Sequence, residues 1–195
     1  KLLNNAKFGH TRFNVEIEGF NYQNKYPESY IKGIISSLDY SDYRYENITL
    51  DGIYKDGGFN GHLALDDENG AVQIDGKFNF AQRVSDFNLQ ASVKNFRPNA
   101  LNLSDKYVDS DISLNLTADF TGSSIDDVNG RILLDSLVMN TAGKQSYFLD
   151  NLSVTAVQLD GQKEIQVLSP FLIAVVRGDY SYETIPASIM QIVQK

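Results

Sequence analysis

Apolar and polar residues alternate along most of this chain, and no other feature constrains its fold as strongly. In the clearest run, Ile112, Leu114, Leu116, Ala118 and Phe120 are separated by single polar residues. Successive side chains of a β-strand point to opposite faces of its sheet, so the pattern predicts strands with one apolar face and one wet face. With the further runs there are roughly ten expected strands, and the sequence predicts an all-β protein. The further runs are residues 13–17, 48–50, 63–65, 72–80, 87–93, 132–134, 152–156, 165–167 and 172–182.

Asn-Gly pairs stand in front of three of these runs, at Asn60-Gly61, Asn69-Gly70 and Asn129-Gly130. Asparagine and glycine tolerate the positive φ that tight hairpin turns require. We therefore expect each pair to open a strand that is antiparallel to its neighbour.

Two segments have a spacing of three and four residues instead of two. Each follows a proline, Pro27 or Pro186, which suits the first turn of a helix. The sequence thus predicts two short amphipathic helices. Their apolar stripes are Ile31, Ile34, Ile35 and Leu38 in the first, and Ile189, Met190, Ile192 and Val193 in the second.

The surroundings of the two segments resemble each other. A strand pattern precedes each one, and Gly19 stands as far before Pro27 as Gly178 stands before Pro186. This internal repeat predicts that residues 1–42 end one unit and that residues 43–195 form another, within a single β-rich domain of residues 1–195. We expect the chain to be a segment of a longer protein, followed by a further β-repeat.

Charge and composition exclude several classes of function. The formal net charge is -8 and the pI is about 4.7, so the chain lacks the cationic surface that nucleic acids and anionic membranes attract. No cysteine is present, which removes disulfides, thiolate metal sites and cysteine nucleophiles.

Catalytic and metal-binding motifs are missing as well. The chain has only two histidines, His10 and His62, and neither stands in a zinc-protease or serine-hydrolase motif. The acidic stretch of residues 66–68 lacks the spacing of a calcium loop. We expect no enzyme activity, no metal site and no cofactor. Tyr40, Tyr43 and Tyr45 could form a sugar-binding platform or could be ordinary strand residues, and paired carboxylates of a glycosidase stay possible.

Three stretches resemble the AsmA-like and TamB group of long periplasmic proteins, in the form found in Bacteroidetes-type envelopes. They are NGAVQIDGKFNF at residues 69–80, LTADFTGSSIDDVNG at residues 116–130 and LSPFLIAVVRGDYSY at residues 168–182. The resemblance implies a curved, mainly antiparallel sheet, folded as a taco-like open roll or groove. It also implies a periplasmic location, an inner-membrane anchor outside this chain, and a role in phospholipid traffic or outer-membrane assembly. The implied partners are phospholipids or other acyl-chain lipids, neighbouring repeats of the same chain and outer-membrane assembly proteins.

An apolar groove is also compatible with the residues themselves. A sheet that is apolar on one face must cover that face with protein or with a ligand. Small residues on the apolar side, such as Ala91 and Ala118, would leave room there. The alternatives are a carbohydrate-binding or adhesin-like β-sandwich with a closed core and, more distantly, a glycoside-active enzyme. The candidate groove residues are Leu89, Ala91, Val93, Ile112, Leu114, Leu116, Ala118, Ile132, Leu134, Leu152, Val154, Leu172, Ala174 and Val176.

Overall fold

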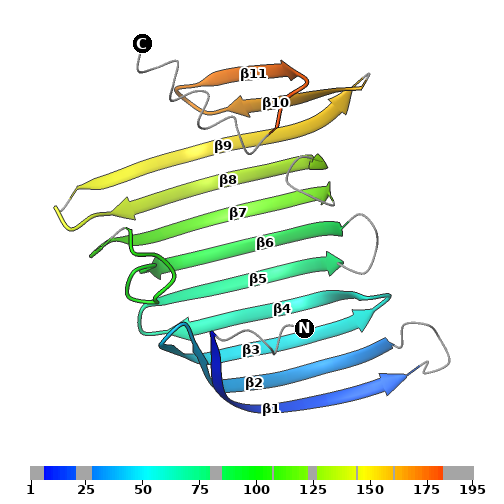
Figure 1. Ribbon diagram of the computed structural model, residues 1–195, viewed down its shortest axis with the longest axis vertical. Helices are drawn as coiled ribbons and strands as arrows, with labels where there is room; N and C mark the ends of the chain where they lie inside the picture. Colours follow the sequence, from blue (N-terminus) through cyan, green and yellow to red (C-terminus); the bar gives the residue numbers. More distant parts are fainter. Residues whose placement is uncertain are drawn as a thin grey trace.

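A computed structural model describes residues 7–20, 28–79, 85–106, 108–122, 127–143, 145–159 and 161–181. These residues form eleven antiparallel strands in one sheet (Figure 1). The prediction of an all-β, antiparallel protein is confirmed. The strands are β1 (Phe8–Phe20), β2 (Glu28–Tyr40), β3 (Tyr43–Lys55), β4 (Gly58–Asp67), β5 (Gly70–Asn79), β6 (Ser85–Phe96), β7 (Asp111–Gly122), β8 (Asn129–Asn140), β9 (Ser146–Leu159), β10 (Gln162–Leu168) and β11 (Ile173–Gly178).

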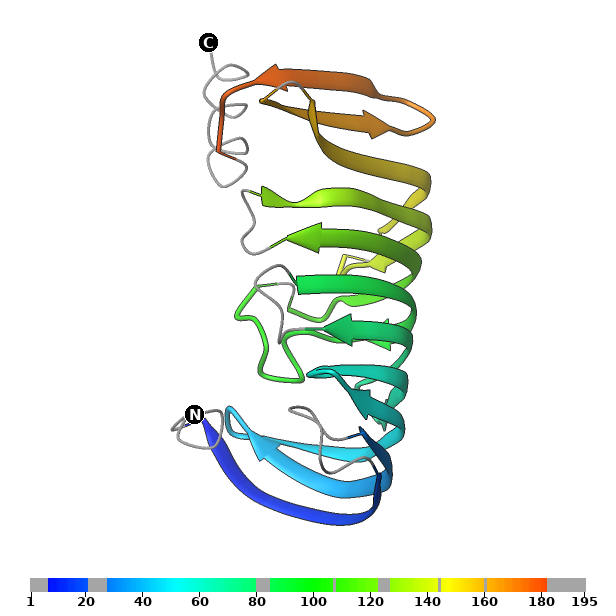
Figure 2. The same cartoon turned by 90° about the vertical axis from the view of Figure 1, so that its right-hand side faces the viewer.

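The order of the strands in the sheet is their order in the chain. Each inner strand pairs with the strand before it and the strand after it, so the sheet is a simple meander. β1 and β11 lie at opposite ends, and the sheet stays open instead of closing on itself (Figure 1). Figure 2 shows that the strands arch along their length, with the loop between β6 and β7 on the inner side of the arch.

The sheet is a single layer. The extensive contacts between strands all join neighbours in the chain, so no described strand packs across the sheet. The accessible surface is 13471 Å², whereas a compact protein of this mass exposes about 9,300 Å². Among the described hydrophobic residues, only Tyr45, Leu101, Ala118 and Ala156 are buried.

The helix expected after Pro27 is wrong, because residues 28–40 form β2. Ile31 and Ile35 are four residues apart, a spacing that places two side chains on one face of a helix and equally on one face of a strand. Ile34 points to the opposite side of the sheet and is 55% exposed. Arg12 pairs with Ser37 and Phe13 with Ile35, so β2 carries one extra residue here. This irregularity returns Leu38 to the face of Ile35, and a β-bulge thereby imitates helical spacing.

The second expected helix, after Pro186, lies outside the described residues. The proposed unit boundary between residues 42 and 43 falls at the tight turn from β2 to β3, where the sheet continues without a break. The division into repeat units stays a prediction.

The turn predictions hold in part. Asn69-Gly70 lies at the hairpin between β4 and β5, and Asn129-Gly130 opens β8. Asn60-Gly61 was expected to be a turn, but it lies inside β4. The turn before β4 is formed by Asp56 and Gly57, whose φ values of 50° and 75° suit a two-residue hairpin.

Candidate functional site

Cross-strand pairing aligns the apolar side chains of all eleven strands on one side of the sheet. Directly paired residues lie on the same face, and this rule can be followed from strand to strand. Leu89 pairs with Ala118, Ala118 with Ile132, and Ile132 with Val154. We call this side the apolar face. Its two central rows are Val15, Gly33, Leu50, Leu63, Ile74, Ala91, Leu116, Leu134 and Leu152, and Ile17, Ile31, Gly52, Gly61, Gly76, Leu89, Ala118, Ile132, Val154, Val167 and Ala174.

The groove candidates from the sequence lie on β6 to β11, with Leu172 just before β11. The pairing places every one of them on the apolar face except Leu172, which precedes β11 in a turn closed by Ser169. The sequence interpretation missed the half of the face that β1 to β5 provide. Alternation was visible in most of these strands, but β2 was assigned to a helix and interrupted the pattern.

The apolar face is only partly shielded. Most of its side chains are half-buried by neighbours in the same layer. Near the two ends of the sheet the exposure is larger, with Phe13 at 67%, Ile17 at 65% and Val176 at 41%. A large apolar surface therefore remains in contact with solvent.

Glycines form part of one row, where Gly52 pairs with Gly61 and Gly61 with Gly76. The ring of Phe59 lies over the first two, and a Cβ placed on Gly61 would come within 2.9 Å of Phe59 Cζ. Aromatic side chains commonly cover glycines of a sheet in this way. The glycine row is therefore partly filled and leaves no open slot beneath Phe59.

Aromatic residues occupy the next row, in which Phe59 pairs with Phe78, Phe78 with Phe87, and Phe87 with Phe120. The rings of Phe87 and Phe120 are stacked, with centroids 4.7 Å apart and planes at 21°. The apolar face thus has an aromatic row next to its glycine row.

The loop between β6 and β7 covers one margin of the apolar face. Leu101 in this loop is fully buried, and its carbonyl oxygen accepts a hydrogen bond of 2.7 Å from the Tyr45 hydroxyl. Asn102 Nδ2 donates to the Ser41 carbonyl at 3.2 Å, and Arg97 N donates to the Asn69 carbonyl at 2.9 Å. These bonds fasten the loop to the turns that precede β3 and β5.

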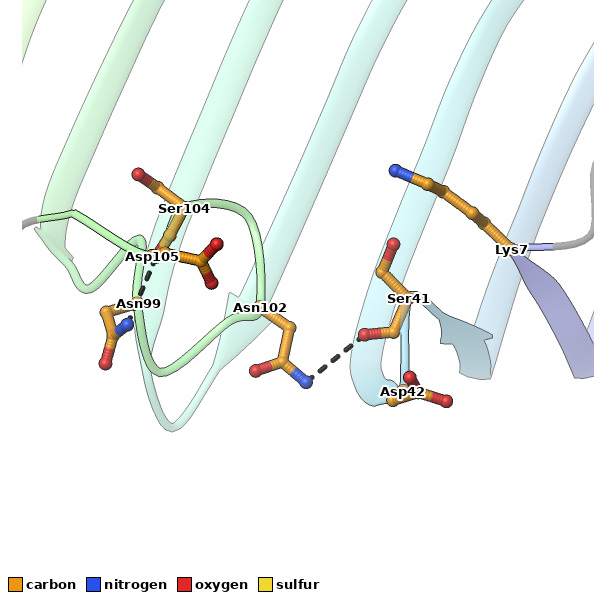
Figure 3. A pocket seen from close by; sticks show the side chains of 7 residues that line it. All are labelled: Lys7, Ser41, Asp42, Asn99, Asn102, Ser104 and Asp105. Atoms are coloured by element: carbon orange, nitrogen blue, oxygen red, sulfur yellow. Dashed lines mark hydrogen bonds between the residues drawn. The ribbon is translucent and has the colours of Figure 1, made fainter.

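A polar hollow of about 400 Å³ lies between this loop and the turn from β2 to β3 (Figure 3). Asn102 and Ser41 meet across it, while Asn99 Nδ2 donates to the Ser104 carbonyl within the loop. The hollow is shallow and its walls are polar. It therefore forms part of the rim of the apolar face. The lining residues are Lys7, Ser41, Asp42, Asn99, Asn102, Ser104 and Asp105.

The tyrosine cluster is engaged in contacts within the protein. Tyr43 donates to Asp67 Oδ1 at 2.5 Å and accepts from Asn69 Nδ2, and its ring meets the ring of Tyr45 edge-on. Burial is the main cause that raises the pKa of Tyr43 to about 12, and burial also raises the pKa of Tyr45. Both hydroxyls are occupied, which does not favour a sugar-binding platform.

The opposite side of the sheet is polar over most strands, and we call it the polar face. Its charges are paired across strands: Lys32 with Asp51 at 3.5 Å, and Lys77 with Asp86 at 2.6 Å. His62 Nδ1 lies 2.8 Å from Asp75 Oδ1, and a carboxylate partner on a wet strand explains this histidine without a catalytic role. The polar face is therefore the natural solvent side.

Metal ligands do not gather in the part of the chain that the structure describes, which holds no group of three or more suitable side chains. Nor does any helix there have the length and apolar character to cross a membrane. No family model, no curated protein and no solved structure matches this chain.

Proposed function

We propose that this chain is a non-enzymatic, lipid-carrying segment of a longer cell-envelope protein, and that acyl chains lie on its apolar face. The observation that carries the proposal is the unbroken apolar face of eleven strands, over which the described residues place no second layer. Apolar surface in water costs about 25 cal/mol per Å², so such a face favours an apolar ligand.

The size of the face suits an acyl chain. Strands lie about 4.8 Å apart, so the sheet is about 50 Å long, more than twice the length of a common fatty acyl chain. Full burial of a methylene group gains about 0.8 kcal/mol, and burial on one side gains about half of that value. A chain of about 15 carbons then gains about 6 kcal/mol. A phospholipid with two chains could therefore be held without enclosure.

The strands arch, and the loop between β6 and β7 lies on the inner side of the arch (Figure 2). Because Leu101 of this loop contacts Tyr45 at the margin of the apolar face, the arch supports a groove whose inner surface is the apolar face. In this arrangement acyl chains contact the aliphatic and aromatic rows, and the lipid head group stays in water or at the polar rim. The polar face with its paired charges would form the outside. The proposal includes a conformation in which the sheet closes further around the lipid, as a taco-like roll.

The resemblance noted in the sequence supports a location of this function in the cell envelope. We place the segment in the periplasm, within a protein anchored in the inner membrane, where adjoining repeats would extend the apolar face. Phospholipid traffic and outer-membrane assembly are the processes that such an extended face would serve.

The test is to count lipids bound to the purified chain by native mass spectrometry after incubation with phosphatidylethanolamine vesicles. We expect bound phospholipid in the parent chain and at least a tenfold loss in Ala91→Glu, because a carboxylate on the apolar face would have to be desolvated beside an acyl chain. Ala91 is half-buried between Ile74 and Leu116.

The matched control is Ser92→Glu, which adds the same charge next door on the polar face, opposite Gln73 and Asn115. This variant should bind lipid like the parent chain, and circular dichroism should confirm that both variants are folded. Equal binding by both variants, or a parent chain that takes up no lipid from the vesicles, would rule out the apolar face as the lipid site.

A further inference from the structure

The two edges of the sheet differ in how they are protected. Exposed edge strands usually carry charges, prolines or bulges that hinder pairing with another strand. β1 contains Arg12, Glu16 and Glu18, and its pairing with β2 has two irregularities. β11 pairs regularly with β10 and lies in a run of six apolar residues, 171–176, that contains no charge and no proline.

β11 is also apolar on both sides. Ala174 and Val176 belong to the apolar face, whereas Ile173 and Val175 point to the opposite side, where other strands are polar. Ile173 is 78% exposed and Val175 is 53% exposed. Among the described strands, only β10 pairs with β11, and no described strand lies on its outer edge.

The side chains on the two faces of β11 decide which strand of another copy can pair with its edge. If β1 of another copy were added, the polar-face residues of β1, such as Glu16 and Glu18, would lie next to Ile173 and Val175. This pairing would place carboxylates against exposed apolar side chains. If β11 of another copy were added, apolar residues would meet apolar residues on both sides of the sheet.

A two-fold axis perpendicular to the sheet keeps the apolar faces of two copies on the same side. Antiparallel pairing about such an axis is centred on a single residue. Centring on Ala174 pairs Leu172 with Val176 and Ile173 with Val175, so that five consecutive pairs are apolar. Centring on Val175 would instead set Arg177 against Ile173, which is less favourable.

We propose that two copies of this chain associate through β11, paired antiparallel about Ala174. The two apolar faces then join into one continuous face. The contact is short, so we expect a concentration-dependent dimer instead of a permanent one. The inference does not depend on lipid binding. In the longer protein proposed above, a following repeat is the alternative occupant of this edge.

The absence of native cysteine allows a direct test by single-cysteine cross-linking of the complete chain. In Ala174→Cys the paired Cα atoms would lie about 5 Å apart, within the range of a disulfide. In the control Val176→Cys the two thiols would be separated by four residues along the strand, about 13 Å. We expect a rapid disulfide-linked dimer with the first variant and only slow, collisional linkage with the second.

Sedimentation velocity over a concentration series gives an independent measurement. Ile173→Lys should weaken association about tenfold or more, because two lysines would approach each other near the axis. Phe13→Lys is the matched control on the other edge strand, where the side chain is 67% exposed, and it should leave association unchanged.

The proposal is overturned if the chain stays monomeric throughout the series and Ala174→Cys does not cross-link. Amide hydrogen exchange then shows whether the edge of β11 is occupied or open in the monomer. Protection of residues 173–176 in a monomer would identify another part of this chain as the occupant of the edge, and fast exchange would show that the edge is open. Association that survives Ile173→Lys would place the contact elsewhere.

Discussion

Tyr45 shows how a single residue fixes a loop on a sheet that has almost no interior. Its side chain is 7% exposed, and its hydroxyl is bonded to the Leu101 carbonyl across 56 residues of sequence. We predict that Tyr45→Phe lowers the free energy of unfolding by about 1–2 kcal/mol, because a buried carbonyl loses its donor. Urea denaturation measures the loss.

Tyr147 is a matched control for this substitution. It is 54% exposed, and its hydroxyl bonds to the side chain of nearby Gln145. Tyr147→Phe should change the stability by less than about 0.5 kcal/mol. Similar losses in the two variants would show that the Tyr45 hydroxyl does not hold the loop.

At the scale of elements, the glycine row lets β4, β5 and β6 pair closely. Gly76 has a φ of +147°, and a Cβ there would lie 2.2 Å from the Asn88 carbonyl oxygen and 2.6 Å from Leu89 Cα. These are backbone atoms, so the clash can be relieved only by moving β6. We predict that Gly76→Ala destabilises the protein by about 3 kcal/mol in thermal denaturation.

Gly143, in the turn between β8 and β9, provides the comparison, since no atom lies within 4 Å of an added Cβ. Gly143→Ala should be neutral or slightly stabilising. If Gly76→Ala were equally harmless, the strands could not be as closely constrained as the glycine row indicates.

On the scale of the whole molecule, the meander resembles a one-dimensional array. An inner strand is held by two neighbours and an edge strand by one, and no second layer couples distant strands in the described part of the chain. We therefore predict that amide protection is highest in β4 to β8 and falls towards β1 and β11. Hydrogen exchange with mass spectrometry, at concentrations too low for association, measures this gradient. Uniform protection of all strands would contradict it and indicate a single cooperative unit.

Local patterns in the sequence determined the strands and the sides on which their apolar residues lie. Side-chain direction in a strand depends only on the residue's position along it, so Leu114, Leu116 and Ala118 could be assigned to one face without knowledge of their neighbours. The same reasoning failed at β2, because the bulge next to Ser36 arises from pairing with β1 and is invisible in the sequence of β2 alone.

Only the tertiary structure decided what those apolar sides meet. Alternation gives each strand an apolar side, but it does not say whether that side packs against a second sheet or stays on a single open layer. The burial of Tyr45 by Leu101 and the alignment of Gly52, Gly61 and Gly76 also depend on which strands are neighbours and in which register. Neighbouring strands are consecutive in the chain, but their register depends on turns and bulges formed by two strands together, and the contact of Tyr45 with Leu101 joins residues 56 positions apart. The alternation within one strand encodes neither.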